Sequence, residues 1–300
     1  MKETMYHSPV LLTASVSGLN IRPASVYVDA TFGGGGHSQE ILDNMDNKSK
    51  LFAFDQDEDA QHNAIEDTRF TLIPQNFGYL KRFMKFYKID KIDGILADLG
   101  VSSHQFDTPN RGFSIRFDGP LDMRMNQHQQ LSAKEIVNTY SESRLADLFF
   151  SYGELRNAKK IAHLIVQNRV AEIETTMHLN EVLSQVLPKG NEHKVLAKIY
   201  QSIRMEVNKE IEALKSFLTQ SKDVLRSGGR MSVISYHSLE DRIVKRFIQN
   251  GNFDNEPEKD DFGNPTLYFK KCGGLVVPNQ NEIKNNNRAR SAKLRIAQRL

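Results

Sequence analysis

The most constraining feature of this sequence is a run of four glycines, residues 33–36, set between a strand-like and a helix-like segment. Val26–Ala30 is a short β-rich run, and His37–Met45 carries apolar residues at helical spacing. Glycines at such a turn let the backbone approach a ligand closely, and the following helix N-terminus offers free N–H groups. The segment Asp29–Ser38 therefore predicts a ligand-binding turn at the end of a strand.

The first third of the chain alternates strand-like and helix-like segments. Three further runs, Leu51–Phe54, Phe70–Ile73 and Ile92–Ala97, have the apolar, β-rich character of buried strands, and Ala60–Glu66 suits a helix. This rhythm predicts an α/β fold, with a mostly parallel sheet covered by helices on both faces.

The rhythm changes after about residue 112. Nearly every segment of Ser132–Leu187 reads as helix, and one long helix is predicted over Val195–Leu225, ended by Gly228 and Gly229. A strand pattern resumes at Met231. We therefore predict a discontinuous α/β domain, residues 1–112 and 200–300, into which an all-helical domain, residues 113–199, is inserted.

Composition limits the class of protein. The 300 residues include a single cysteine, Cys272, so neither an intrachain disulfide nor a thiolate metal cage can form. The N-terminal segment lacks the apolar run of a signal peptide, and no stretch approaches the roughly 20 apolar residues of a membrane span. We expect a soluble, cytoplasmic protein that does not act at a membrane and holds no metal.

Charge is informative only in its distribution. The net charge of +3 is too small to identify a nucleic-acid-binding protein. From Lys284 to the end, however, the chain has six basic residues and no acidic one. Such a tail can neutralise phosphates, or it can simply solubilise the terminus, and charge alone leaves both interpretations open.

Asp55 indicates what the glycine turn could bind. It ends the second predicted strand, 22 residues after Gly33, near the spacing at which a carboxylate takes ribose hydroxyls. A dinucleotide fingerprint starting at Gly33 would need glycine where Ser38 stands, and no phosphate-binding loop for ATP is present. The pattern favours S-adenosylmethionine, which has a ribose but no pyrophosphate; a nicotinamide cofactor is disfavoured but stays open.

Two later segments should meet the same edge of the sheet. Asp98 ends the fourth predicted strand, and Ser235–Arg242 follows the strand that resumes the sheet. Ligands of open α/β sheets bind at the carboxyl ends of strands, so Asp98 and His237 are expected beside Gly33 and Asp55. A serine-hydrolase site at Ser238 is rejected because no G-x-S-x-G elbow surrounds it, and Ser238 is instead predicted to cap a helix.

With these segments in view, the whole chain resembles the bacterial small-subunit (16S) rRNA cytidine-N4 methyltransferase family, also called MraW or RsmH. The resemblance is carried by long, ordered motifs from end to end: His7–Leu12, Asp29–Ser38, Asp55, Asp98–Ser103, Arg111–Ser114, Asp118–Met125, Ser235–Phe247 and Arg288–Arg295. One departure is His104, where relatives often have proline, which should alter only the local turn.

The resemblance implies a class I (Rossmann-like) methyltransferase fold and S-adenosylmethionine as the donor. The residues that it implies contact this cofactor are Gly35, Gly36, His37, Asp55, Phe77, Asp98 and Gln105. For Phe77, packing against the adenine is physically reasonable, although without the resemblance it reads as ordinary core.

The implied substrate is a cytidine in the decoding region of 16S rRNA, methylated on its exocyclic N4 amine within the assembling 30S subunit. An acceptor aimed at the amine hydrogens would localise the nitrogen lone pair, and we expect Asp98, or the backbone of the Asp98–Ser103 loop, to be that acceptor. Candidate RNA contacts are Arg111, Arg116, Arg124, His237, Arg288 and Arg290. The oligomeric state, including a homodimer, stays open.

Three alternative functions are considered beside this one. A DNA amino-methyltransferase would carry a proline-containing [DNS]-P-P-[YF] loop after the fourth strand, where this chain has Asp98-Leu99-Gly100-Val101. A non-catalytic ribosome-assembly factor would bind cofactor and RNA without turnover. A nicotinamide oxidoreductase would bind a different cofactor.

Overall fold

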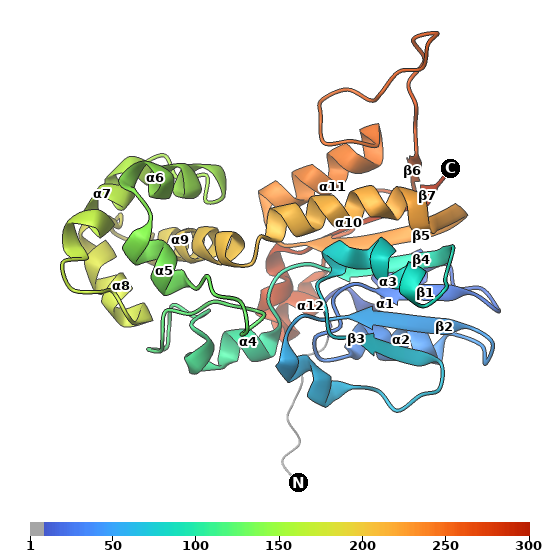
Figure 1. The fold of residues 1–300 in the computed structure, drawn as a ribbon, viewed down its shortest axis with the longest axis horizontal. Helices are drawn as coiled ribbons and strands as arrows, with labels where there is room; N and C mark the ends of the chain where they lie inside the picture. The colour runs from blue at the N-terminus through green and yellow to red at the C-terminus, as the bar shows by residue number, and fades with distance from the viewer. Residues whose placement is uncertain (1–8) are drawn as a thin grey trace. The chain divides into compact units, whose positions relative to one another are not determined.

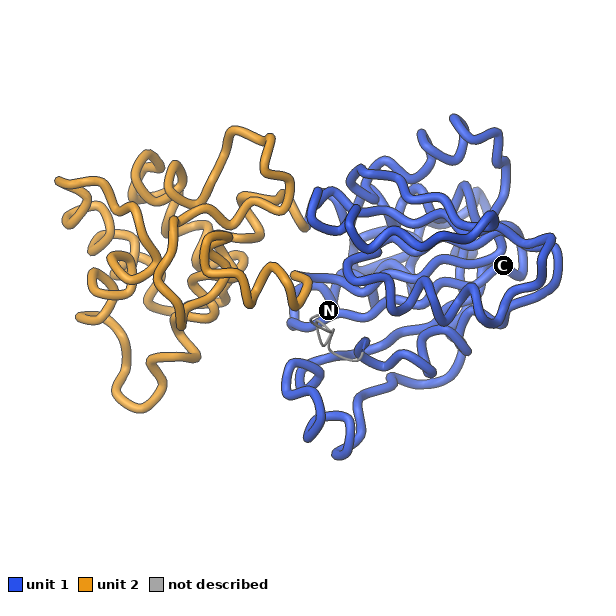
Figure 2. The backbone as a smooth tube through the Cα atoms, turned by 90° about the horizontal axis from the view of Figure 1, so that it is seen from below, with its two compact units in different colours: residues 1–100, 211–300 blue, residues 101–210 orange. Residues whose placement is uncertain are grey.

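The computed structural model describes residues 9–300, so that His7 and Ser8 of the first motif lie outside it. The chain forms two compact units (Figure 2): the chain up to Gly100 together with Ile211–Leu300, and Val101–Glu210. The predicted insertion, 113–199, lies within the second unit, which starts earlier and ends later. At both ends, apolar residues such as Val101 and Val207 pack in the core of this second unit.

The first unit is built on a seven-stranded sheet with the strand order β3-β2-β1-β4-β5-β7-β6 (Figure 1). The first five strands in this order are parallel, and β7 pairs antiparallel with both β5 and β6. The strands are β1 (Val26–Asp29), β2 (Lys50–Phe54), β3 (Phe70–Ile73), β4 (Ile92–Asp98), β5 (Leu225–Ser235), β6 (Phe269–Lys271) and β7 (Lys293–Arg299).

This strand order, with one antiparallel strand inserted beside β5, is that of the class I methyltransferase fold, which confirms the expected fold class. The central strands are apolar almost throughout because both of their faces are covered, as in β4, where every residue before Asp98 is buried. The carboxyl ends of β1, β2, β4 and β5 therefore meet at one edge of the sheet.

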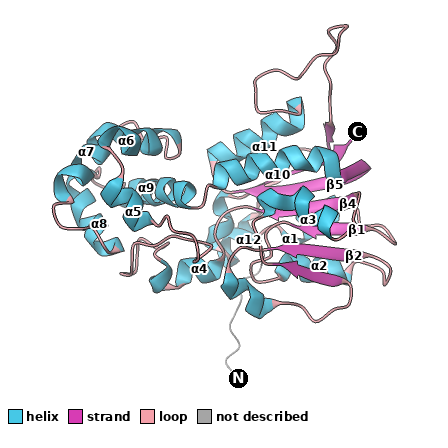
Figure 3. Ribbon diagram, in the orientation of Figure 1, coloured by secondary structure: helices cyan, strands magenta, loops and turns pink. Residues whose placement is uncertain are grey.

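Helices cover both faces of this sheet (Figures 1 and 3). Helices α1 and α2 pack on one face, and α3, α10 and α11 lie over the other. The helices of this part are α1 (Leu12–Leu19), α2 (Gly36–Asp43), α3 (Leu80–Phe86), α10 (Glu210–Val224), α11 (Ser238–Asn250) and α12 (Gln280–Asn285), with 3-10 turns η1 (Glu58–Asn63), η2 (Phe77–Tyr79) and η5 (Asn287–Ser291).

The second unit is helical, as predicted: residues 101–210 contain no strand, apart from an isolated bridge between Pro120 and Thr175 (Figure 3). Its helices enclose a separate apolar core that includes Phe149, Ile161 and Ile199, each fully buried. They are α4 (Ser103–Asp107), α5 (Ala133–Thr139), α6 (Glu142–Ser151), α7 (Ala158–Asn168), α8 (Thr176–Leu183) and α9 (Glu192–Val207), with 3-10 turns η3 (Pro109–Arg111) and η4 (Ser184–Val186).

The long helix predicted over 195–225 is wrong as a single helix. It is broken between α9 and α10, where Lys209 has a left-handed backbone with φ 48°. The side chain of Asn208 ends α9 by accepting a hydrogen bond from Met125 N at 2.8 Å and donating one to Met123 O at 2.8 Å. A tertiary contact, invisible in local periodicity, thus stops the helix.

Two smaller predictions also need correction. Gly228 and Gly229 do not end α10, which stops at Val224; they lie in β5, where the register with β4 is irregular and Gly228 has φ 82°. The helix predicted over Ala60–Glu66 is instead the 3-10 turn η1, whose first turn is held by Asp57 accepting a hydrogen bond from Asp59 N.

Two properties of the described residues bear on the class of protein. Among residues 9–300, no helix combines the length and apolar character that crossing a bilayer requires. Within the same residues, no three His, Cys, Asp or Glu side chains are grouped so as to hold a metal ion.

Candidate active site

The glycine turn joins β1 to α2 and is closed by Asp29. One oxygen of this carboxylate accepts a hydrogen bond from Thr31 N at 3.0 Å, and the other accepts one from Ser38 Oγ at 2.7 Å. Asp29 is fully buried, and burial raises the pKa of its carboxyl to about 6. Asp29 therefore fastens both ends of the turn and does not face a ligand.

The glycines of the turn are required by the protein's own geometry. Gly35 has φ 80°, a conformation that is strained for any residue with a Cβ. A Cβ on Gly36 would collide with the ring of Pro9. Both residues stand where predicted, at the start of α2, and they bring its first N–H groups to the carboxyl edge of the sheet.

Asp55 follows β2 directly and contacts the glycine turn. Its Oδ2 accepts a hydrogen bond from Gly33 N at 2.7 Å, and its Oδ1 accepts one from Asp57 N at 2.9 Å. Burial raises the pKa of this carboxyl to about 6, against the effect of both hydrogen bonds. Each carboxylate oxygen can accept a second bond, so Asp55 is oriented by the backbone and can still take ligand hydroxyls.

Asp98 ends the central strand β4 and is tied to three neighbours. Its backbone N–H donates to Thr31 Oγ1 at 2.7 Å, and its Oδ1 accepts a hydrogen bond from the Tyr236 hydroxyl at 2.8 Å. Its Oδ2 lies 3.9 Å from His37 Nδ1. Burial raises the pKa of this carboxyl to about 6, although 22% of the side chain remains exposed. Asp98 is thus a held acceptor with an accessible edge.

His37 is the third residue on this edge. Its ring is buried, and Nε2 lies 3.1 Å from the carbonyl oxygen of Val10. Because a carbonyl can only accept, Nε2 must carry a proton, which leaves Nδ1 to face Asp98. The ring therefore anchors the start of α2 to the Val10 carbonyl, and its Nδ1 lies near the Asp98 carboxylate without a hydrogen bond to it.

Sequence reasoning missed Tyr236, which follows β5. Burial and the neighbouring Asp98 carboxylate raise the pKa of its phenol well above the usual value, so the hydroxyl stays protonated and donates. Its backbone N–H donates to Glu240 Oε2 at 3.0 Å. Its position could have identified it as a site residue, because Tyr236 lies in the Ser235–Arg242 segment, at the carboxyl end of a strand.

His237 is placed at the same edge but caps α11. Its side chain accepts from Glu240 N, so the N-cap is His237 rather than the predicted Ser238, which is the first helical residue. Nε2 of His237 lies 3.0 Å from Glu240 Oε1, close in distance although not in hydrogen-bond geometry. Only 12% of the His237 side chain is exposed.

Phe77 begins the turn that follows β3. It is half-buried and packs edge-on against Phe217 of α10, with ring centroids 5.4 Å apart. This contact fixes the ring beyond the carboxyl end of β3, next along the sheet edge from Asp55.

Gln105 belongs to the second unit and has a structural task there. It is buried, and with Ser102 it forms the capping box of α4: its side chain accepts from Ser102 N at 3.0 Å while Ser102 Oγ accepts from Gln105 N at 3.2 Å. His104 lies in the first turn of α4, where the helical ladder needs no N–H group, so histidine and proline both fit.

The three arginines predicted to contact RNA in the second unit differ sharply. Arg111 is buried and donates to Arg124 O and Met125 O, at 2.9 and 3.2 Å. Arg124 is paired with Asp122 through two hydrogen bonds of 2.8 and 2.7 Å. Arg116 alone of the three is exposed. Arg111 and Arg124 thus hold their loop, and Arg116 faces solvent.

The basic tail is similarly divided. Lys293 and Arg295 of β7 both contact Asp241, at 3.3 and 2.7 Å, and Arg299 Nε donates to Lys222 O at 3.1 Å. Arg290 is exposed and Arg288 half-buried. The end of the tail is thus part of the sheet, and Arg290 is the tail arginine most accessible to a partner.

Proteins of known sequence match this chain along its whole length. The protein named ribosomal RNA small subunit methyltransferase H of Christiangramia forsetii is 59% identical over 296 residues, 98% of either chain. Proteins of the same name from Flavobacterium johnsoniae and Cytophaga hutchinsonii are 59% and 54% identical, and the matches cover 100% and 98% of this chain and 100% of each relative. A family model described as the MraW methylase family matches residues 4–300, and with this coverage the chain belongs to that family.

Proposed function

We propose that this chain transfers a methyl group from S-adenosylmethionine to the N4 amine of a cytidine in the decoding region of 16S rRNA. The names of its relatives support the ribosomal RNA substrate. The observation that carries the chemistry is Asp98, a carboxylate held at the end of β4 by Tyr236, with part of its surface open. The proposed setting is the assembling 30S subunit in the cytoplasm.

The residues at the carboxyl edge suit this cofactor. Asp55 is an oriented carboxylate that can accept hydrogen bonds from the two ribose hydroxyls. Its negative charge would repel a phosphate on the 2′ oxygen. The start of α2 at Gly35, Gly36 and His37 supplies backbone N–H groups for a carboxylate such as that of a methionine moiety. Phe77 offers an aromatic surface for a base. Gln105 stays a cofactor contact implied by the family resemblance.

When bound, S-adenosylmethionine supplies an electrophilic methyl group on a sulfonium cation. The cytosine amine is a poor nucleophile because its lone pair is delocalised into the ring. The amine nitrogen would bond to the methyl carbon as the bond from that carbon to sulfur breaks, which leaves S-adenosylhomocysteine as the neutral product. Asp98 would accept a hydrogen bond from the amine and thereby localise its lone pair. It would also stabilise the positive charge that develops on the nitrogen, and it would take the proton that the methylated amine then loses. A backbone carbonyl of the Asp98–Ser103 loop is the alternative acceptor.

Tyr236 acts through Asp98. The Tyr236 hydroxyl occupies Oδ1, and this fixes the carboxylate plane so that Oδ2 is the oxygen left for substrate. Most of the rate should come from holding two reactants in near-attack geometry, since no proton need leave before the methyl group moves.

On the RNA side, the target cytosine must leave any stack to reach the site. Arg116 and Arg290 are exposed and suit contacts to phosphates, and His237 follows β5 at the carboxyl edge of the sheet. Arg111 and Arg124 are less available, because both already donate hydrogen bonds to backbone oxygens of their loop. Arg288 is half-buried.

The test is methyl transfer in vitro. The purified protein is incubated with methyl-labelled S-adenosylmethionine and small subunits from a strain that lacks the enzyme, and the RNA is digested to nucleosides. We expect label in N4-methylcytidine. Cofactor binding without transfer would favour an assembly factor, and label in DNA cytosine or adenine would favour a DNA amino-methyltransferase.

A further inference from the structure

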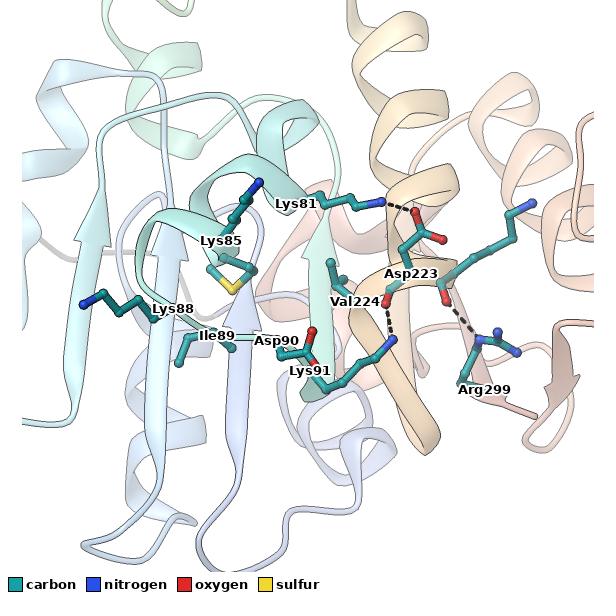
Figure 4. Close-up of a pocket in the computed structure, with 11 residues that line it drawn as sticks. Lys81, Lys85, Lys88, Ile89, Asp90, Lys91, Asp223, Val224 and Arg299 are labelled. Atoms are coloured by element: carbon teal, nitrogen blue, oxygen red, sulfur yellow. Dashed lines mark hydrogen bonds and ion pairs between the residues drawn. The ribbon is translucent and has the colours of Figure 1, made fainter.

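A second charged feature lies outside the candidate active site. A groove of about 700 Å³ opens between α3, the start of β4 and the junction of α10 with β5 (Figure 4). Its lining includes six cationic side chains and two carboxylates, a net charge of +4, in a chain whose total net charge is only +3. The cations are Lys81, Lys85, Lys88, Lys91, Lys222 and Arg299.

Most of this positive charge is not neutralised by carboxylates. Lys81 Nζ pairs with Asp223 at 2.6 Å, whereas Lys91 Nζ donates to the backbone oxygen of Asp223, also at 2.6 Å. Lys222 Nζ donates to Gly251 O and lies 4.3 Å from the centre of the Tyr268 ring. Carbonyls and rings orient these ammonium groups without cancelling their charge.

Lys85 and Lys88 are the most available cations of the groove. Both are exposed, and within residues 9–300 neither ammonium group has a hydrogen-bond or ion-pair partner. Lys81 and Lys85 are four residues apart on one side of α3, and Lys88 lies just beyond the end of this helix, in a left-handed backbone with φ 58°. Figure 4 draws the two side chains in different directions, Lys85 upward and Lys88 to the left, whereas Lys81 points to the right toward Asp223.

The groove lies at the opposite edge of the sheet from Asp98. Lys91 directly precedes β4, Val224 precedes β5, and Arg299 ends the antiparallel β7. Strand β4 runs from the groove to Asp98, a distance of about 20 Å at roughly 3.3 Å per residue. A ligand that touches both edges must therefore be far longer than one nucleotide.

The charge of the groove indicates the kind of partner that it suits. Ammonium groups bind phosphates, so a cationic groove suits nucleic acid. Two exposed aromatic residues that are close in sequence, Tyr79 and Phe86, do not line the groove. A concave groove also fits a strand-like polyanion better than it fits a flat lipid surface.

We propose that this groove, named here the amino-edge groove, binds the phosphate backbone of the ribosomal RNA at a segment away from the target cytidine. The proposal rests on the proposed function, which supplies the RNA. The groove would raise affinity for the subunit and fix its orientation, whereas sequence would be read elsewhere.

The test neutralises the two unpaired lysines in the full-length protein as Lys85→Gln with Lys88→Asn. Asparagine is chosen because Lys88 has φ 58°, a backbone that asparagine tolerates. The control is Lys48→Gln with Lys50→Gln, which removes the same charge from an exposed residue of the turn before β2 and from the exposed first residue of β2. Binding to small subunits and to anionic vesicles is measured against salt, and methyl transfer to subunits is followed alongside.

We expect the groove variant to bind subunits about tenfold more weakly at 0.15 M salt, with a salt slope smaller by about 1.5 for two lost phosphate contacts. The control should bind as wild type does. Equal losses in both variants, an unchanged slope, or a loss confined to vesicles would each overturn the proposal. If the groove variant does not fold, protection of Lys85 and Lys88 from acetylation by bound subunits decides the question in the wild-type protein.

The two proposals fail separately. If the wild-type protein makes no N4-methylcytidine but binds subunits through the groove, the proposed function is wrong and the groove stands. If the wild type methylates subunits and the groove variant binds them normally, the groove proposal alone is wrong.

Discussion

The two edges of the same sheet carry opposite chemistry. At the carboxyl edge, the buried or partly buried carboxylates Asp29, Asp55 and Asp98 each have a pKa raised to about 6. At the amino edge, exposed lysines such as Lys85 and Lys88 surround an open groove. Because the carboxylates are buried, their interactions are strong and should change greatly when a single atom is replaced. Because the lysines are exposed, salt screens their interactions, and the loss of one of them should change binding only modestly. Substitutions should therefore have large effects on chemistry at one edge and modest effects on affinity at the other.

The largest expected effect is at Asp98. Asp98→Asn keeps the size of the side chain but removes the charge that would take up the developing positive charge of the amine. We expect kcat for methyl transfer to fall on the order of 10³-fold, while cofactor binding changes far less. The matched control is Asp43→Asn, an exposed carboxylate at the end of α2, which should stay within about twofold of wild type. Equal kcat values for Asp98→Asn and wild type would remove Asp98 from the mechanism.

Asp55→Asn should weaken the binding of S-adenosylmethionine at the carboxyl edge. The amide retains one acceptor oxygen where Gly33 N, Asp57 N and the ribose hydroxyls need several. Loss of charge-assisted hydrogen bonds should raise the Kd for S-adenosylmethionine about 100-fold. Calorimetric titration measures this directly, and a Kd within threefold of wild type would show that Asp55 does not hold the ribose.

The affinity for the cofactor should depend on pH. Because the pKa of Asp55 is raised to about 6, its carboxyl gains a proton as the pH falls through 6. We expect the Kd for S-adenosylmethionine to rise about tenfold from pH 7.5 to pH 5. For the stability of the protein without cofactor the sign is opposite: the contribution of the raised pKa of Asp55 is fully present below about pH 4 and is lost as the pH rises through 6. A Kd independent of pH over this range argues against Asp55 as a ligand of the cofactor.

Tyr236→Phe should give a smaller effect with a distinct signature. Loss of the hydroxyl removes one hydrogen bond from Asp98, and this bond holds the pKa of that carboxyl down. We expect kcat to fall about tenfold, and the acid limb of the pH–rate profile to move to higher pH. KM for the cofactor should hardly change. A lower kcat with an unmoved profile would indicate a merely structural role for Tyr236.

The smallest expected effects are those that a substitution at one edge has on the function of the other edge. Lys85→Gln with Lys88→Asn should leave the Kd for S-adenosylmethionine unchanged, and Asp55→Asn should leave the salt slope of subunit binding unchanged. Crossed effects in either direction, measured by the same two titrations, would mean that the edges are not independent.

The carboxyl edge was largely predictable from sequence, because parallel strands bring residues that follow them to one place. Gly33, Asp55 and Asp98 each follow a strand with a strong local pattern, and the structure brings them together as expected. Tyr236 was not singled out, since its hydroxyl meets Asp98 across 138 positions of sequence. Local pattern gives no measure of such a pairing.

The amino edge could not be predicted in the same way. Its cations come from α3, from the loop between α3 and β4, from the end of α10 and from the end of β7, and no single run of charge joins Lys85, Lys222 and Arg299. The sequence pointed instead to the basic tail as a site that could neutralise phosphates, yet Arg295 of this tail forms an ion pair with Asp241. Likewise Arg111 reads as an exposed loop arginine but holds backbone carbonyls inside its unit. Which basic side chains remain available to a ligand therefore depends on the contacts that each one makes in the folded protein.

The most direct test of the account is the nucleoside content of 16S rRNA in cells. The gene for this chain is deleted from its own organism, and the strain is complemented with wild type or with Asp98→Asn. Mass spectrometry then quantifies N4-methylcytidine in digested 16S rRNA. The account predicts that the nucleoside disappears on deletion, returns with the wild type and stays absent with Asp98→Asn. An unchanged level of N4-methylcytidine in the deletion strain would contradict it.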